Sequence, residues 1–330
     1  MERVDRRGFL LIAAGLVLAA RPVTAARRIA RIGFLNPGPR YQGQALLTAL
    51  RDGLDQLGWV AGRDIVIVDH WAEGHLPELP GLAAELVAAR VDLVVTNGTP
   101  ATLAARAANP SLPIVMVGVE YSAGQLLGAA LPPDSNLTGL SLGSTELTGE
   151  RLRVLQQLVP GLDRIAVMLR DEPGVQIAFE DVRRNARRLG IDVTELVVTS
   201  GETIERAFRW TRSNNCRALY FASGPLGSAK HGQVIARAAA ARLPTVYPFR
   251  AFAEDGGLVS VAPDSQELFR RAAGFVDKVL NGVKPVDLPV APPKSFELVI
   301  NLAAAKAIGV IIPEALLARA DTVIGRRQES

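Results

Sequence analysis

One stretch constrains the fold more than any other: VDLVVTNGTPATLAARAA, residues 91–108, which joins an apolar run to a helix through a polar turn. The apolar run predicts a parallel strand that is buried on both faces. In the turn, Gly98 can adopt a positive φ, Thr99 can cap the following helix, and Pro100 occupies a position where a missing N–H is tolerated. An ordinary strand-to-helix connection would need the same residues. However, turns of this kind also bind ligands, anions above all, at the carboxyl edge of α/β sheets.

The same alternation of strand and helix recurs along the whole chain. In the first part we expect strands at 28–35, 65–71, 91–95 and 114–119, and helices at 42–57, 79–89 and 100–108. In the second part we expect strands at 164–169, 191–198, 218–222 and 244–247, and helices at 147–159, 175–189, 204–212 and 233–241. Each series predicts a doubly wound α/β sheet.

Two such series suggest two similar lobes. The segment 131–143, LPPDSNLTGLSLG, interrupts the alternation and is rich in Pro, Ser, Asn and Gly, so we interpret it as a crossing between lobes. After the second series we expect a strand at 258–261, a long amphipathic helix at 268–280 and an extended, proline-rich stretch at 282–293. A last strand at 296–300 and two short helices, the final one at 313–320, complete the expected elements.

The amino-terminal segment has the pattern of an export signal. Arg6 and Arg7 precede an apolar run, residues 9–20, that is too short to span a membrane, and the small-residue motif Val23-Thr24-Ala25 follows. The paired arginines resemble a twin-arginine signal, and a general secretory signal is the alternative. We expect cleavage near Ala25 and a periplasmic protein. Since no cysteine lies near that position, we expect no lipid anchor there.

Composition excludes several classes of function. Removing residues 1–25 lowers the formal charge from +4 to +2, which gives no electrostatic basis for binding nucleic acid. The only cysteine, Cys216, cannot form an intramolecular disulfide or a multi-cysteine zinc site. His70, Glu73 and His75 lie across an expected strand end and the solvated loop after it, not on one helical face, so we expect no metal. No nucleophile stands beside the carboxylates at 163 or 171–172, so we expect neither an enzyme nor a cofactor.

Several segments carry a family resemblance: RIGFL, NGTPATLAA, DSNLTGLS and, most specifically, the tail from LFRRAAGFVDKVLNG to IPEALLARAD. The chain resembles the extracytoplasmic substrate-binding proteins of ABC transporters that include the tryptophan-binding type. The resemblance implies a periplasmic-binding-protein type I fold, α/β, with two Rossmann-like doubly wound lobes joined by three crossing segments. Lobe 1 would comprise 28–135 and 257–282, and lobe 2 would comprise 136–256 and 283–330. A small molecule would bind between the lobes and be delivered to a membrane permease.

The resemblance also implies ligand contacts at loops that face the cleft. From lobe 1 and the first crossing these are Asn36, Pro37, Asn97, Gly98, Thr99, Pro100, Glu120, Tyr121, Thr138 and Gly139. From lobe 2 they are Arg170, Asp171, Ser223, Gly224, Pro225, Tyr247 and Arg250. Many relatives carry an acidic-Pro-Val turn where this chain has Glu120-Tyr121-Ser122, which puts the identity of the ligand in doubt. Arg170 and Arg250 could each bind a ligand carboxylate or form a salt bridge between lobes.

These observations favour a transport receptor, monomeric, that binds an amino acid or an aromatic or aliphatic carboxylate. A ligand-sensing subunit for a membrane receptor and an exported α/β enzyme are the alternatives, since a fold does not determine a function. A sugar ligand is disfavoured because Trp59, Trp71 and Trp210 lie away from the expected cleft loops. A repressor of the same architecture would need a DNA-binding helix pair where this chain has its export signal.

Overall fold

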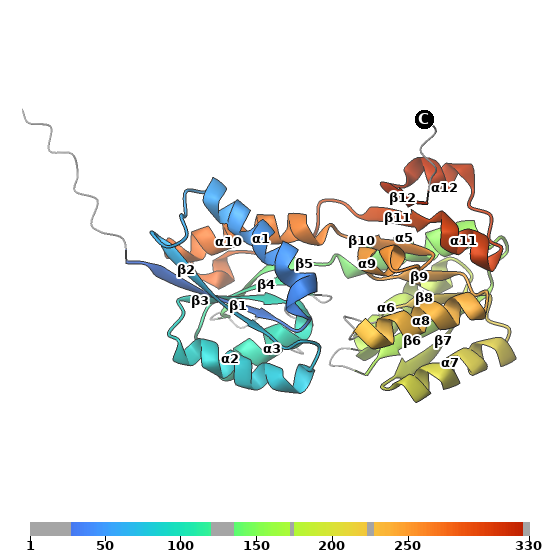
Figure 1. Ribbon diagram of the computed structural model, residues 1–330, viewed down its shortest axis with the longest axis horizontal. Helices are drawn as coiled ribbons and strands as arrows, with labels where there is room; N and C mark the ends of the chain where they lie inside the picture. Colours follow the sequence, from blue (N-terminus) through green and yellow to red (C-terminus); the bar gives the residue numbers. More distant parts are fainter. Residues whose placement is uncertain (1–27, 120–134, 172–174, 223–227, 326–330) are drawn as a thin grey trace, which may run out of the picture.

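The computed structural model describes residues 28–119, 135–171, 175–222 and 228–325, so the expected export signal lies outside the described part. Two lobes lie side by side along the longest axis of the molecule (Figure 1). Each lobe is a sheet with helices on both of its faces, as the alternation of elements predicted.

The first lobe contains a parallel sheet of five strands in the order β2-β1-β3-β4-β5. Its strands are β1 (Ala30–Asn36), β2 (Ile65–Trp71), β3 (Leu93–Asn97), β4 (Ile114–Val119) and β5 (Leu137–Ser141). Its helices are α1 (Arg40–Gln56), η1 (Leu76–Glu78), α2 (Leu79–Ala88), α3 (Gly98–Ala108) and α10 (Ser265–Leu280). Helices α1 and α10 pack together, and α2 packs on α3. β1 has β2 on one side and β3 on the other, so the order of the strands reverses beside β1.

Helix α10 joins the first lobe through close packing on α1. Leu47, Leu50 and Leu54 of α1 recur on one helical face and are buried in the same core as Phe269 of α10. Gly53 makes the close approach possible, because a Cβ at that position would collide with the carbonyl oxygen of Arg270. A segment late in the sequence therefore completes the first lobe.

The second lobe contains a sheet of seven strands in the order β12-β11-β10-β9-β8-β6-β7. Its strands are β6 (Arg164–Arg170), β7 (Asp192–Val198), β8 (Ala218–Phe221), β9 (Thr245–Tyr247), β10 (Val259–Ala262), β11 (Glu297–Asn301) and β12 (Thr322–Ile324). Its helices are α5 (Ser144–Leu158), α6 (Val175–Arg188), α7 (Gly201–Ser213), α8 (Ser228–Ala240), α9 (Arg250–Glu254), α11 (Leu302–Ile308) and α12 (Glu314–Arg319). All pairs are parallel except β10–β11, which is antiparallel.

Three segments cross between the lobes: residues 142–143, residues 263–264, and residues 281–296, which include η2 (Pro285–Asp287). The third crossing is held against β5. The Thr138 hydroxyl donates to the Leu288 carbonyl at 2.8 Å, and the Ala291 N–H donates to the Gly139 carbonyl at 3.0 Å. The expected arrangement of three crossings is therefore confirmed.

The structure differs from the expectations at particular strands. β5 lies inside the stretch interpreted as a crossing, and it pairs with β4 in the first sheet rather than belonging to lobe 2. β10, expected in lobe 1, pairs with β9 in the second sheet. Helix α9 and strand β12 were not expected at all. The chain therefore crosses after β5 and after β10, one strand later than the sequence suggested in each case.

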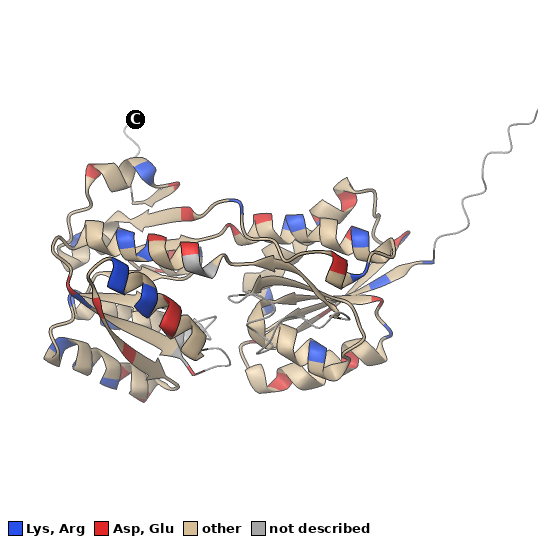
Figure 2. Ribbon diagram, turned by 180° about the vertical axis from the view of Figure 1, so that it is seen from behind, with Lys and Arg blue, Asp and Glu red and all other residues tan. Residues whose placement is uncertain are grey.

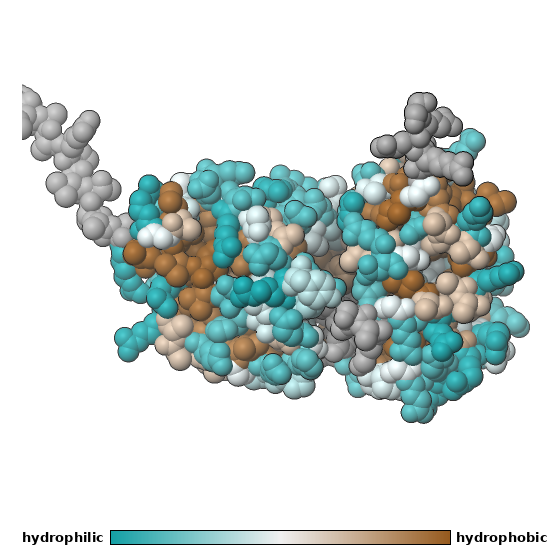
Figure 3. All heavy atoms as spheres, viewed as in Figure 1, coloured by the Kyte–Doolittle hydropathy of each residue, from teal (hydrophilic) through white to brown (hydrophobic). Residues whose placement is uncertain are grey.

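The surface of both lobes carries mixed charges. Basic and acidic residues both occur along the helices of each lobe (Figure 2), and the face seen in Figure 3 is largely polar with patches of apolar residues, most clearly on the first lobe. Among the described residues, no helix combines the length and apolar character that crossing a membrane would require.

Candidate functional site

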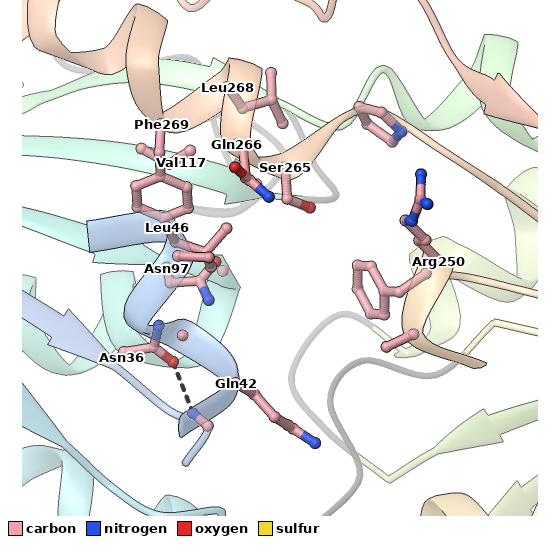
Figure 4. Close-up of a pocket in the computed structure, with 18 of the residues that line it drawn as sticks. Asn36, Gln42, Leu46, Asn97, Val117, Arg250, Ser265, Gln266, Leu268 and Phe269 are labelled. Carbon is pink, nitrogen blue, oxygen red and sulfur yellow. Dashed lines mark hydrogen bonds between the residues drawn. The ribbon is translucent and has the colours of Figure 1, made fainter. Parts of the chain in front are cut away.

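A cavity of about 450 Å³ lies between the two lobes. On the first lobe it is lined by residues at the ends of β1, β3 and β4 and by the first turns of α1 and α3; we call the lining residues from Asn36 to Gly118 the first-lobe wall. On the second lobe it is lined by His231, Phe249, Arg250, Ala251, Phe252, Glu254 and Glu297, which we call the second-lobe wall. The amino-terminal end of α10 lies between these two walls (Figure 4).

The first-lobe wall forms where the strand order of the first sheet reverses. Asn36 ends β1 and Asn97 ends the neighbouring β3, so both side chains lie at the crevice where open α/β sheets bind ligands. Helices α1 and α3 start from these strand ends, and neither has a side-chain cap or an acidic residue in its first turn. At α1 the Arg40 N–H already donates to the Glu73 carboxylate at 3.1 Å, so it is the amino-terminal end of α3 that directs uncompensated partial positive charge toward the cavity.

Two buried polar groups on this wall have no hydrogen-bond partner. The Asn36 side chain accepts a hydrogen bond from the Gly38 N–H at 2.8 Å, but its Nδ2 has none, and the Thr99 Oγ1 is likewise unpaired. Both residues are buried, at 2% and 8% exposure. Buried donors without partners are costly in native proteins, and their presence in a cavity points to a ligand. In Figure 4 the amide groups of Asn36 and Asn97 point toward the same space.

Hydrogen bonds of the Thr96 and Thr102 side chains fix the turn that carries Thr99. The Thr96 and Thr102 hydroxyls lie 2.7 Å apart, and Thr102 also donates to the Gly98 carbonyl at 2.9 Å. Gly98 has φ 74°, as expected from the sequence. The expected cap by Thr99 is wrong, since the helix starts at Gly98 with Asn97 in the cap position and no side-chain cap bond. Thr99 is therefore held rigidly while its hydroxyl remains available.

The second-lobe wall combines one guanidinium with two carboxylates. Arg250 donates from Nε to Glu254 at 2.7 Å, and from Nη1 to Glu297 and to Thr322. The hydrogen bond to Glu254, with the charge of Glu297 adding to it, raises the pKa of Arg250. Both carboxylates belong to the second lobe. Arg250 therefore forms ion pairs within its own lobe, and the expected alternative of a salt bridge between lobes is wrong for this residue.

Aromatic rings complete the second-lobe wall. The His231 ring packs against Phe252, tilted by 38° with the ring centroids 3.6 Å apart, and its Nε2 lies 3.7 Å from Asp255 without a hydrogen bond. Burial lowers the pKa of His231, against a smaller opposing effect of Asp255. Across the cavity, Leu46, Leu268 and Phe269 supply apolar surface. The cavity thus combines apolar sides with a few directed polar groups, as small-molecule sites do.

Comparison with known proteins agrees with this geometry. The family profile described as "ABC transporter substrate binding protein" matches residues 43–324. This chain belongs to that family. A curated relative, the tyrosine-binding protein of Clostridioides difficile strain R20291, is 24% identical over 262 residues, which cover 77% of this chain and 74% of the relative.

Solved structures of similar proteins share the two-lobed fold. The ABC domain from Streptococcus pneumonia, solved in complex with L-Trp, is 26% identical with a TM-score of 0.76 over 89% of this chain and 100% of that one. A conserved domain protein from Vibrio cholerae is 24% identical with a TM-score of 0.80 over 90% of this chain and 100% of that one. The family and the fold expected from the sequence are thereby confirmed.

The structure brings together part of the site that the sequence suggested for this substrate-binding protein. The residues that line the cavity are Asn36, Pro37, Asn97, Gly98, Thr99, Pro100 and Arg250. The side chain of Arg170 is not described, and Glu120, Tyr121, Ser223, Gly224 and Pro225 lie outside the described residues. These positions stay predictions.

Four expected contacts lie outside the cavity. Thr138 is buried and bonds to the third crossing, and Gly139 leaves no room for a side chain because a Cβ there would collide with the Met116 backbone. Tyr247 is buried between Phe221 and Phe252, where desolvation raises its pKa. Asp171 is exposed beyond the end of β6. Packing therefore accounts for the presence of Thr138, Gly139 and Tyr247 at these positions.

Sequence reasoning missed the contributions of Gln42, Leu46, Phe269 and Glu297 to the cavity. Glu297 begins β11, and it reaches the cavity because β11 runs antiparallel to β10, with Glu297 opposite Ala262. An antiparallel strand places its first residue at the edge where its parallel neighbours end. Because Glu297 precedes its strand, the rule that ligand contacts follow strands does not include it.

Proposed function

We propose that this protein is the extracytoplasmic receptor of an ABC importer, which binds an aromatic amino acid or aromatic carboxylate between its lobes and delivers it to the permease. The observation that carries the proposal is the pair of buried, unpaired groups on the first-lobe wall, Asn36 Nδ2 and Thr99 Oγ1. A ligand oxygen would satisfy both. Relatives described as tyrosine-binding and as bound to L-Trp support this ligand class.

The arrangement of the two walls supports a role in transport. The cavity is lined from both lobes, so a ligand that contacts both favours a closed state, and closure changes the surface offered to a membrane partner. We infer that the protein acts by binding rather than catalysis, as a monomer without cofactor, in the periplasm after its signal is cleaved. The export route is tested by replacing both Arg6 and Arg7 with Lys and determining where in the cell the protein is then found.

Ligand binding tests the proposal directly. The mature chain, freed of ligand by unfolding and refolding, is titrated calorimetrically with L-tryptophan, L-tyrosine, L-phenylalanine, benzoate and, as a negative control, glucose. We expect one aromatic compound to bind and to raise the melting temperature, since a ligand at a hundredfold excess over Kd stabilises the native state by about 2.7 kcal/mol.

A matched pair of variants identifies the site. Thr99→Val keeps the shape of the side chain and removes the unpaired hydroxyl, so it should weaken binding several-fold. Thr211→Val removes a buried hydroxyl that bonds to the Phe208 carbonyl in α7, and its affinity should equal that of the wild type. The proposal fails if no compound of the panel binds, or if both variants bind like the wild type.

A further inference from the structure

The two walls of the cavity have opposite electrostatic character. We propose that they select an α-amino acid in one orientation, with its carboxylate on the first-lobe wall and its ammonium on the second-lobe wall. This inference rests on the proposed function, because it specifies the substrate class of the same cavity. It separates amino acids from the simple aromatic carboxylates that the proposed function also admits.

The first-lobe wall offers hydrogen-bond donors to the cavity. None of the residues that line the cavity on this wall has an ionisable side chain. Its directed groups are the unpaired Asn36 Nδ2, the Thr99 hydroxyl and the uncapped amino-terminal end of α3. Helix α10 differs, because Asp264 caps it by accepting from the Gln266 and Glu267 N–H groups at 2.8 and 3.2 Å. A carboxylate is the group that suits the uncapped end of α3 and the unpaired amide donor.

The second-lobe wall carries an excess of negative charge among its described residues. Glu254 and Glu297 share the single guanidinium of Arg250, and burial of His231 beside them lowers its pKa and so disfavours its protonated form. Arg250 already uses Nε and Nη1 on these carboxylates, so it is not free to form a two-pronged contact with a ligand carboxylate. A second carboxylate brought here would be repelled, whereas an ammonium would meet oxygens that accept hydrogen bonds.

An amino acid satisfies both walls at once. Its carboxylate would bind first to the rigid first-lobe wall, and its ammonium would then stabilise the approach of the second lobe. The side chain would occupy the apolar space between Leu46 and Phe269 on one side and Phe252 on the other. A compound without the ammonium would bind to the first lobe alone and leave the lobes apart.

Three related compounds test the orientation: L-tryptophan, indole-3-propionate, which lacks the ammonium, and tryptamine, which lacks the carboxylate. Calorimetry measures affinity and small-angle X-ray scattering measures closure. We expect L-tryptophan to bind tightest and to reduce the radius of gyration. Indole-3-propionate should bind at least tenfold more weakly without that reduction, and tryptamine should bind weakest.

Glu297→Gln tests the second wall, with Glu314→Gln, an exposed residue of α12, as the matched control. We expect Glu297→Gln to weaken L-tryptophan about tenfold while leaving indole-3-propionate unchanged or tighter. Glu254→Gln should act in the same direction, so the test does not depend on the folding of one variant. Equal weakening of both compounds would show a merely structural role and overturn the inference.

The failures of the two proposals are distinguishable. If indole-3-propionate binds at least as tightly as L-tryptophan and closes the lobes, the inferred orientation is wrong while the receptor function stands. If none of the three compounds binds, and L-tyrosine, L-phenylalanine and benzoate also fail, the proposed function itself is wrong.

Discussion

Gly43 of α1 lies directly against Asn36 at the end of β1. A Cβ at residue 43 would stand 2.8 Å from the Asn36 Nδ2 and closer still to the ring of Trp71. The absence of a side chain in the first turns of α1 therefore leaves the space in which the unpaired amide sits. The same helix that supplies its amino-terminal end to the cavity thus fixes the position of the donor.

Gly43→Ala should reduce both ligand affinity and stability. The added methyl group must displace the Asn36 amide or the Trp71 ring, and overpacking of this kind costs about 1–3 kcal/mol, which exceeds the gain in helix propensity. We expect affinity for the ligand to fall at least several-fold. Calorimetric titration and urea unfolding measure the two effects.

Gly274→Ala is the matched control in the interior of α10. A Cβ there meets nothing within 4 Å, so only the gain in helix propensity remains, roughly 0.5–1 kcal/mol. Ligand affinity should not change. A Gly43→Ala protein that binds like the Gly274→Ala protein would show that the Asn36 amide does not need its present position.

Asn36→Asp separates the two functions of this side chain. A carboxylate can still accept the Gly38 N–H bond that shapes the loop, but it replaces the unpaired donor with a negatively charged acceptor. Binding of a ligand carboxylate should therefore weaken tenfold or more while the far-ultraviolet circular dichroism spectrum is retained. Unchanged affinity would exclude Asn36 Nδ2 from the ligand site.

Acidification should destabilise the folded protein through His231. Burial lowers its pKa below the ordinary value of 6.5, so between these two pKa values the unfolded chain binds a proton that the folded chain does not. The contribution of His231 to the free energy of unfolding is therefore complete above pH 6.5, and it is lost as the pH falls from 6.5 to the pKa of His231 in the folded protein. Asp255, the acidic group that faces the ring at 3.7 Å, reduces this loss but does not reverse it.

Urea unfolding at a series of pH values measures this dependence. His231→Phe keeps an aromatic ring against Phe252 and removes the titrating group, so its stability should fall less than that of the wild type between pH 7.5 and 5.5. His75→Gln, at an exposed position, should follow the wild type. Equal slopes for His231→Phe and the wild type would contradict the prediction.

The sequence predicted most of the fold because strands buried on both faces and amphipathic helices leave distinct patterns. The strands at 65–71 and 114–119 have the expected bounds. β5 was missed because its sequence, LTGLS, is as polar and glycine-containing as the loops beside it. It is buried nonetheless, and the Thr138 hydroxyl is satisfied by a carbonyl 150 residues later, a contact that no local pattern contains.

The candidate site, like the fold, could be predicted from the sequence in one part and not in the other. The first-lobe wall follows from a local rule, since polar residues between a strand and a helix lie at the carboxyl edge of a sheet, and Asn36 and Thr99 obey it. The second-lobe wall depends on tertiary arrangement. Arg250 was expected there, but Glu297 arrives through an antiparallel strand and His231 through the packing of α8 on Phe252.

Arg151 should be the most costly charged residue to remove from the second lobe. It lies on α5 at 5% exposure, and it donates to the carbonyls of Val261 at 2.8 Å and Pro248 at 2.9 Å, and to the Tyr220 hydroxyl at 3.3 Å.

Arg151→Met would leave two buried carbonyls unpaired, at a cost of about 3 kcal/mol. Arg153→Met, at an exposed position on the same helix, should cost less than about 0.5 kcal/mol. The Pro248 carbonyl lies just before Arg250 and the Val261 carbonyl just before the second crossing, so Arg151 also fixes the second-lobe wall relative to that crossing. Urea unfolding measures the stability of both variants, and titration of Arg151→Met should show weaker ligand binding. A variant as stable as the wild type would mean that water replaces all three bonds.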